Sequence, residues 1–104
     1  MSASEPARRL SIILPVYNEA ATIAALLERV LAVDLKGLGK EIIIVEGNST
    51  DGTREIVRGF AARPGVRVLY EDRPRGKGVA VRAGLAVATG EFILIQAGAL
   101  EYDP

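Results

Sequence analysis

The sequence predicts an α/β fold in which one parallel β-sheet is covered by helices, in the order β-α-β-α-β-α-β. Four short apolar runs alternate with amphipathic segments along the chain. The clearest run does not alternate polar and apolar residues, which is typical of a strand buried on both faces. The connections are short, and this favours right-handed crossovers in a three-layer, Rossmann-like arrangement.

The four apolar runs define the predicted strands. Residues 42–45, Ile-Ile-Ile-Val, are the clearest case. The polar segment before the first strand, residues 1–9, is expected to be flexible, and Pro15 is expected to end that strand. Both the second and the fourth strand are expected to be buried. The predicted strands comprise residues 10–14, 41–45, 66–70 and 92–95.

Three helices are predicted between these strands. Asn18 is a predicted N-cap of the first helix, and Glu19 in its first turn would suit the helix dipole. The second helix covers about residues 53–62, and the third, residues 79–88, is rich in alanine and can pack closely on the sheet. The residues predicted to form the buried faces of the first two helices are Ile23, Leu26, Leu27, Val30, Leu31, Ile56, Val57 and Phe60.

The composition excludes several classes of function. The 104 residues fit one small domain, and 13 basic residues balance 13 acidic ones, so no basic field indicates nucleic-acid binding. Neither cysteine nor histidine occurs, so a metal would need oxygen ligands, which suit Mg²⁺, Mn²⁺ or Ca²⁺. No apolar run approaches the roughly 18 residues of a spanning helix. We expect a cytoplasmic protein, and association of a full-length protein with the cytoplasmic face of a membrane stays open.

Four polar loops follow the four predicted strands. Because the carboxyl ends of parallel strands meet at one edge of the sheet, these loops should form a common rim, where open α/β sheets bind ligands. Together they contain carboxylates, hydroxyls, lysine, arginine and glycine, which suits a phosphate or nucleotide. The loops comprise residues 15–19, 46–51, 71–78 and 96–103.

Four motifs from about residue 10 to residue 104 resemble the N-terminal half of family 2 glycosyltransferases. They occur in the family's order, and the nearest branch contains dolichol-phosphate mannose synthases and polyprenyl-phosphate glycosyltransferases. The resemblance implies that residues 10–104 are the N-terminal part of a GT-A domain, which transfers a sugar from a nucleotide diphosphate donor. The motifs are SIILPVYNEAATI, EIIIVEGNSTDGT, RGKGVAVRAGLAVATGEFILIQ and LEYDP.

The first two motifs imply nucleotide-binding residues. By resemblance, Pro15 and Tyr17 would shape the base pocket and Glu19 would reach the nucleoside, although a strand end followed by a helix cap would use the same residues. The second motif usually carries two adjacent acids. Here Glu46 stands for the first and Gly47 replaces the second.

Three further residues of these loops have open roles. Asn48 belongs to the implied nucleotide loop, whereas Asp51 is more often a structural cap or turn residue. Lys77 lies between two glycines that let the backbone approach an anion, and its ammonium group adds a point charge. On its own this short motif would equally suit a solvated basic turn.

The implied metal site is missing. The family places two aspartates, two residues apart, after the fourth strand, where they hold the Mg²⁺ or Mn²⁺ that bridges the diphosphate. This sequence has Ala97 and Ala99 at those positions. Glu101 and Asp103 are also two residues apart, but their offset would move a cation away from the diphosphate. We therefore expect no metal in this chain, although the intact family uses Mg²⁺ or Mn²⁺.

Two hypotheses from different classes remain. In the first, the chain is the donor-binding half of a glycosyltransferase, and its binding of a nucleotide diphosphate sugar is weak or lost. It would be inactive alone, because the aspartate pair and the acceptor region are absent. Alternatively, it is a non-catalytic α/β binding or self-assembly module. An uncovered sheet edge predicts a homo-oligomer in either case. A lipid or membrane acceptor would belong to the full-length protein, and no glycine-rich dinucleotide or P-loop motif occurs.

Overall fold

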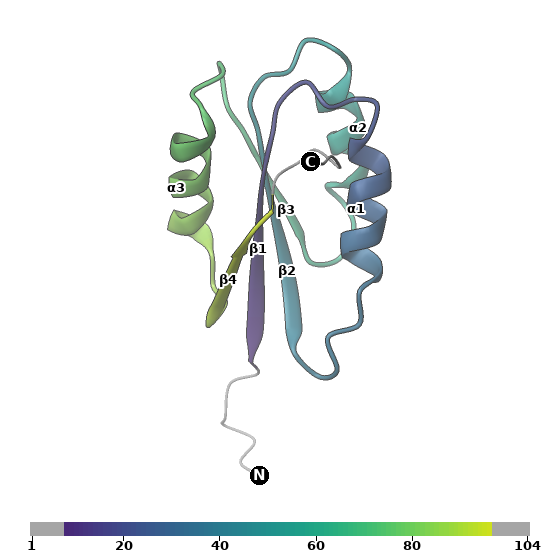
Figure 1. The fold of residues 1–104 in the computed structure, drawn as a ribbon, viewed down its shortest axis with the longest axis vertical. Coiled ribbons are helices and arrows are strands. Elements are labelled where there is room, and N and C mark those ends of the chain that lie inside the picture. Colours follow the sequence, from purple (N-terminus) through teal and green to yellow (C-terminus); the bar gives the residue numbers. More distant parts are fainter. Residues whose placement is uncertain (1–7, 97–104) are drawn as a thin grey trace, which may run out of the picture.

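A computed structural model describes residues 8–96 and confirms the predicted order of elements (Figure 1). Four strands alternate with three helices in this part of the chain. In order, the elements are β1 (Arg9–Val16), α1 (Ile23–Ala32), β2 (Gly39–Glu46), α2 (Thr53–Phe60), β3 (Val66–Tyr70), α3 (Lys77–Val87) and β4 (Phe92–Ile95).

The four strands form one parallel sheet in the order β3-β2-β1-β4. Helices α1 and α2 cover one face and α3 covers the other, which confirms the three-layer prediction (Figure 1). After β3, the chain crosses to the other face and returns to pair β4 with β1. The order therefore reverses at β1, and such a switch point is where open α/β sheets form a ligand crevice at the carboxyl edge.

Each face of the sheet has its own apolar core. On β2, Ile42 and Ile44 pack toward α1 and α2, whereas Ile43 and Val45 pack toward α3. All four side chains are buried. This explains why the sequence shows an unbroken apolar run: alternate residues point to opposite faces, and both faces are covered.

Helix α3 lies very close to the sheet. A Cβ atom on Gly84 would lie 2.6 Å from Cγ2 of Ile13, so only glycine fits at this position. Ala80 is also buried on the same side. Small residues thus let α3 approach the sheet, as its composition predicts.

Two predictions about helix and strand ends are wrong. Helix α1 begins at Ile23 with Thr22 before it, so Asn18 caps no helix and Glu19 lies outside the first turn. Asn18 instead adopts a positive φ of 51° in a loop held by contacts to the next loop. Pro15 does not end β1, which continues to Val16. The strand β4 pairs with β1 only as far as Ile13, so one side of β1 is unpaired at residue 15. A proline, which lacks the N–H, is tolerated on such an unpaired side.

The prediction that the fourth strand is buried is wrong. The residues of β4 are all 41–49% exposed, because the strand lies at the edge of the sheet and pairs only with β1. Within residues 8–96, no strand pairs with the outer edge of β4. The apolar run FILI indicated a strand correctly, but its position in the sheet was not encoded locally.

Candidate functional site

A cleft of about 290 Å³ opens at the carboxyl edge of the sheet. Its walls come from the ends of β1 and β2, the loop after β3 and the start of α3. Four of the six predicted nucleotide-binding residues line it: Pro15, Tyr17, Glu19 and Lys77. Segments separated by some 60 residues of sequence therefore meet at one place, as the parallel topology requires.

The cleft combines an apolar interior with charged groups. Val45 and Ala80 lie in its lining together with Tyr17, whose side chain is partly exposed. Glu71 and Arg75 also line it, from the loop between β3 and α3. An apolar concavity with a few charged groups is typical of a site for a small organic ligand.

The start of α3 forms the basic part of the cleft. Lys77 is the first residue of this helix, and Gly76 before it has a φ of 91°, a conformation that favours glycine. The first N–H groups of a helix have no intrahelical acceptor and attract anions. Together with the cations of Lys77 and Arg75, this end of the cleft is suited to a phosphate group.

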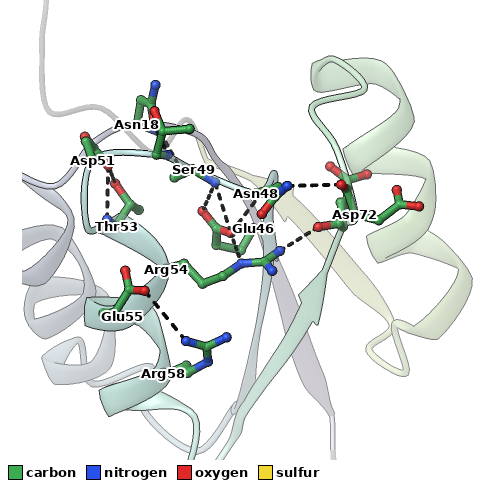
Figure 2. A network of polar contacts seen from close by, with 12 residues as sticks. Asn18, Glu46, Asn48, Ser49, Asp51, Thr53, Arg54, Glu55, Arg58 and Asp72 are labelled. Atoms are coloured by element: carbon green, nitrogen blue, oxygen red, sulfur yellow. Dashed lines mark hydrogen bonds and ion pairs between the residues drawn. The ribbon is translucent and has the colours of Figure 1, made fainter.

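Glu46 does not line the cleft but lies fully buried behind it. Its Oε1 accepts hydrogen bonds from the backbone N–H of Asn48 at 3.0 Å and from Nε of Arg54 at 2.7 Å, and Oε2 accepts one from the N–H of Ser49 at 3.2 Å (Figure 2). Burial alone would raise the pKa of Glu46, but these hydrogen bonds from Ser49, Arg54 and Asn48 outweigh it and lower the pKa below its ordinary value. The carboxylate is thus ionised and fully occupied inside the protein.

Asn48 also lies outside the cleft lining. It adopts a positive φ of 66°, and its side-chain amide donates a hydrogen bond to the carbonyl of Asp72 at 3.0 Å (Figure 2). Arg54 adds a second link by donating from Nη2 to the carbonyl of Glu71. Both contacts join the loop after β2 to the loop after β3.

Another set of contacts joins the loop after β1 to the loop after β2. The Oδ1 of Asn18 accepts a hydrogen bond from the N–H of Thr50, and Oδ2 of Asp51 accepts one from the N–H of Ala20. Asp51 also accepts from the hydroxyl of Thr53, and this hydrogen bond lowers the pKa of Asp51. The structural interpretation of Asp51 is confirmed.

One functional candidate was not singled out from the sequence. Glu71 lines the cleft, next to Gly47 of the second motif. The only sequence signal of Glu71 was its position, since it directly follows the carboxyl end of β3. A glutamate in a loop of mixed charge carries no local motif.

The expected metal positions lie outside the described residues. This applies to Ala97 and Ala99, and equally to Glu101 and Asp103. Between residues 8 and 96, no three acidic, histidine or cysteine side chains are grouped so that they could hold a metal ion. The two alanines offer no side-chain ligand, so the residues present do not fit the metal that the resemblance implies.

A family model described as glycosyl transferase family 2 matches residues 11–104. The chain belongs to this family. Its four-stranded parallel sheet corresponds to the first part of the family's GT-A fold.

Curated relatives of this family 2 glycosyltransferase chain are named as undecaprenyl-phosphate 4-deoxy-4-formamido-L-arabinose transferases. The protein of Aeromonas hydrophila subsp. hydrophila is 34% identical over 98 residues, which are 91% of this chain and 30% of the relative. That of Edwardsiella ictaluri is 34% identical over 107 residues, covering 100% of this chain and 33% of the relative. The chain therefore spans about a third of the length of these relatives.

Solved structures of similar fold contain nucleotide sugars. The mannosyltransferase PcManGT from Pyrobaculum calidifontis, in complex with GDP-Man and Mn²⁺, matches with a TM-score of 0.80 and 32% identity, covering 91% of this chain and 31% of that one. TarS 1–349 from S. aureus, in complex with UDP-GlcNAc, matches with a TM-score of 0.78 and 28% identity, covering 86% and 26%. In this family 2 chain, none of the helices described between residues 8 and 96 is long and apolar enough to cross a bilayer.

Proposed function

We propose that the cleft binds the nucleotide of a nucleotide diphosphate sugar, and that residues 10–104 are the donor-binding part of a longer glycosyltransferase. The observation that supports this most is the meeting of Pro15, Tyr17, Glu19 and Lys77 in one cleft. Family membership and the nucleotide sugars in related structures point the same way.

Each cleft residue has a role in this proposal. The base lies against the ring of Tyr17 and beside Pro15, since aromatic rings stack favourably. Glu19 reaches the nucleoside, and the diphosphate lies at the start of α3 near Lys77 and Arg75. Glu46 and Asn48 act indirectly, because their polar groups hold the loops that shape the cleft.

The same proposal assigns no sugar transfer to this chain alone. Ala97 and Ala99 cannot supply the metal ligands, and the relatives are about three times as long. The full-length protein would act on a polyprenyl-phosphate lipid, as the names of the relatives suggest. Such an acceptor would bring it to the cytoplasmic face of a membrane.

Isothermal titration of the 104-residue chain with GDP and with UDP tests nucleotide binding. We expect weak binding of at least one of them, unchanged by Mn²⁺ or by EDTA, because the aspartate pair is absent. Lys77→Met should weaken binding roughly ten- to a hundredfold, since a charge-assisted contact of about 1.5–3 kcal/mol is lost. Lys36→Met, which removes an exposed lysine far from the cleft lining, is the matched control.

Two results would refute the proposal. One is the absence of any nucleoside diphosphate binding by a chain that circular dichroism shows to be folded. The other is tight binding that requires Mn²⁺, which would mean that other residues replace the missing aspartates.

A second candidate function is self-assembly through β4. Its four apolar residues are 41–49% exposed, and among the described residues its outer edge is unpaired. An open apolar edge invites pairing with a second copy. We expect a dimer or higher oligomer by light scattering and a monomer for Ile93→Lys, whereas a wild-type monomer at high concentration would contradict this.

A further inference from the structure

Within the part of the chain that the structure describes, one carboxylate of the cleft has no partner. Among residues 8–96, the side chain of Glu71 has no hydrogen bond and no ion pair, although it lines the cleft. This differs from Glu46, whose carboxylate is fully occupied by internal donors. A carboxylate without an internal partner inside a binding cleft is available to accept hydrogen bonds from a ligand.

The carboxylate of Glu71 lies close to Gly47 in the cleft lining. A Cβ atom on Gly47 would lie 3.4 Å from Cδ1 of Tyr17 and 3.6 Å from Oε1 of Glu71. The space above Gly47 is thus bordered by an aromatic ring on one side and a carboxylate oxygen on the other. A flat heterocycle lying on the Tyr17 ring would present its polar edge near Glu71.

The backbone of Glu71 is held on both sides. Its N–H donates to the carbonyl of Glu46 at 2.8 Å, and its carbonyl accepts from Nη2 of Arg54. The residue is therefore fixed at the end of β3 before any ligand arrives, and only its side chain has to adjust. Such preorganisation reduces the entropy lost on binding.

The hydrogen-bonding edges of the bases decide which one suits a carboxylate. Guanine offers two adjacent donors, N1–H and the exocyclic N2 amino group, which match the two carboxylate oxygens. Uracil offers one N–H between two carbonyl acceptors. Adenine and cytosine have an acceptor nitrogen at the centre of this edge, which a carboxylate repels.

We propose that Glu71 reads the base and that the cleft selects a guanosine diphosphate sugar. This rests on the proposed nucleotide binding and adds the identity of the base. Glu71 reaches the part of the cleft beside Gly47 from the loop after β3. Glu19, the other carboxylate of the cleft, approaches from the loop after β1 and contacts the nucleoside elsewhere.

Titration calorimetry of the 104-residue chain with GDP, UDP, ADP and CDP tests this inference. We expect GDP to bind tightest, UDP next, and ADP and CDP weakest. Glu71→Gln keeps the size of the side chain but replaces one acceptor with a donor, so it should weaken GDP binding roughly ten- to a hundredfold and should not weaken ADP binding. Asp72→Asn removes the same charge from an exposed neighbour outside the cleft and should change nothing.

The possible outcomes distinguish a failure of the Glu71 assignment from a failure of the proposed nucleotide binding. If none of the four diphosphates binds, the proposed nucleotide site itself is wrong and Glu71 has no base to read. If they bind equally, or if Glu71→Gln keeps the wild-type preference, only the assignment of Glu71 is overturned. Loss of the preference in Glu19→Gln instead would transfer the role to Glu19 and also overturn it.

Discussion

At the scale of single residues, the buried side chain of Glu46 holds together the loops that form the cleft. The side chain is fully buried and pairs with Arg54, which is itself only 18% exposed. Its carboxylate also collects the N–H groups of the loop that follows β2. A residue that the family resemblance assigns to the ligand thus holds the framework, and its contribution to binding should be indirect.

Breaking this buried ion pair should destabilise the fold. Arg54→Met leaves Glu46 buried without its cation, so we expect the free energy of unfolding to fall by about 3 kcal/mol, measured by urea denaturation. Arg58→Met is the matched control, because Arg58 lies on the same helix, also contacts Tyr70 and is 57% exposed. Its loss should cost less than about 1 kcal/mol. Equal effects of the two changes would contradict a special role for the Arg54 pair.

The carboxylates of Glu46, which is buried, and Glu41, which is partly buried, should also determine the acid sensitivity of the chain. Burial raises the pKa of Glu46 and of Glu41, but hydrogen bonds from Ser49 and Arg54, and from Ser11 and Thr89, outweigh it, so both pKa values lie below the ordinary one. The unfolded chain then binds more protons than the folded chain in acid. The resulting stability is complete above the unfolded value of about 4.3 and is lost as pH falls through the lowered values.

Urea unfolding at a series of pH values between about 7 and 3 checks this dependence. The midpoint should be nearly constant down to about pH 5 and should fall below about pH 4.3. Glu46→Gln should flatten the acid limb, whereas Glu55→Gln, at an exposed position of α2, should not. A stability that rises on acidification would contradict the assignment.

At the scale of elements, the packing of α3 against the sheet requires a glycine at residue 84. Gly84→Ala would place a Cβ atom 2.6 Å from Ile13, which is fully buried, so we expect a loss of about 1–3 kcal/mol from overpacking. Gly59→Ala in α2 meets nothing within 4 Å and should instead stabilise by about 0.5–1 kcal/mol. Thermal or urea unfolding of both variants measures the difference. If Gly84→Ala also stabilises, α3 is packed less closely than described.

The elements themselves could be predicted because their signals are local. The apolar run of β2 and the helical spacing of α1 and α2 reflect burial by neighbouring layers, and burial leaves a periodic pattern. The start of α1 could not be predicted, since Asn18 has the residue type of an N-cap but serves the loop contact to Thr50. The exposure of β4 was missed because its place at the sheet edge depends on strand order.

The general position of the site could be predicted from the parallel topology of the sheet. Parallel strands bring their carboxyl ends together, so Tyr17 and Lys77 were expected to meet and do line one cleft. Whether a side chain faces the cleft or the interior depends on its neighbours. Glu46 is turned inward by Arg54, and Glu71 is turned to the cleft beside Gly47, and neither outcome has a sequence motif.

At the scale of the whole molecule, the amino and carboxyl edges of the sheet differ in the groups that they present. At the amino edge, the carboxylate of Glu41 accepts hydrogen bonds from Ser11 and Thr89 and ties the turn before β4 to the strands. At the carboxyl edge, internal contacts fix the loops, while Glu71 and Lys77 remain directed to the cleft. Internal contacts thus stabilise both edges of the sheet, and the cleft that contains Tyr17 and Lys77 lies at the carboxyl edge.

Nuclear magnetic resonance of the ¹⁵N-labelled chain during titration with GDP and UDP tests the central claim most directly. The account predicts that amide shifts will cluster at residues 16–19, 47, 71 and 75–77, around the cleft. Amides at the amino edge, such as those of Arg9, Lys40 and Gly65, should stay unchanged. Shifts concentrated at the amino edge, or no shifts from a folded chain at saturating nucleotide, would contradict it.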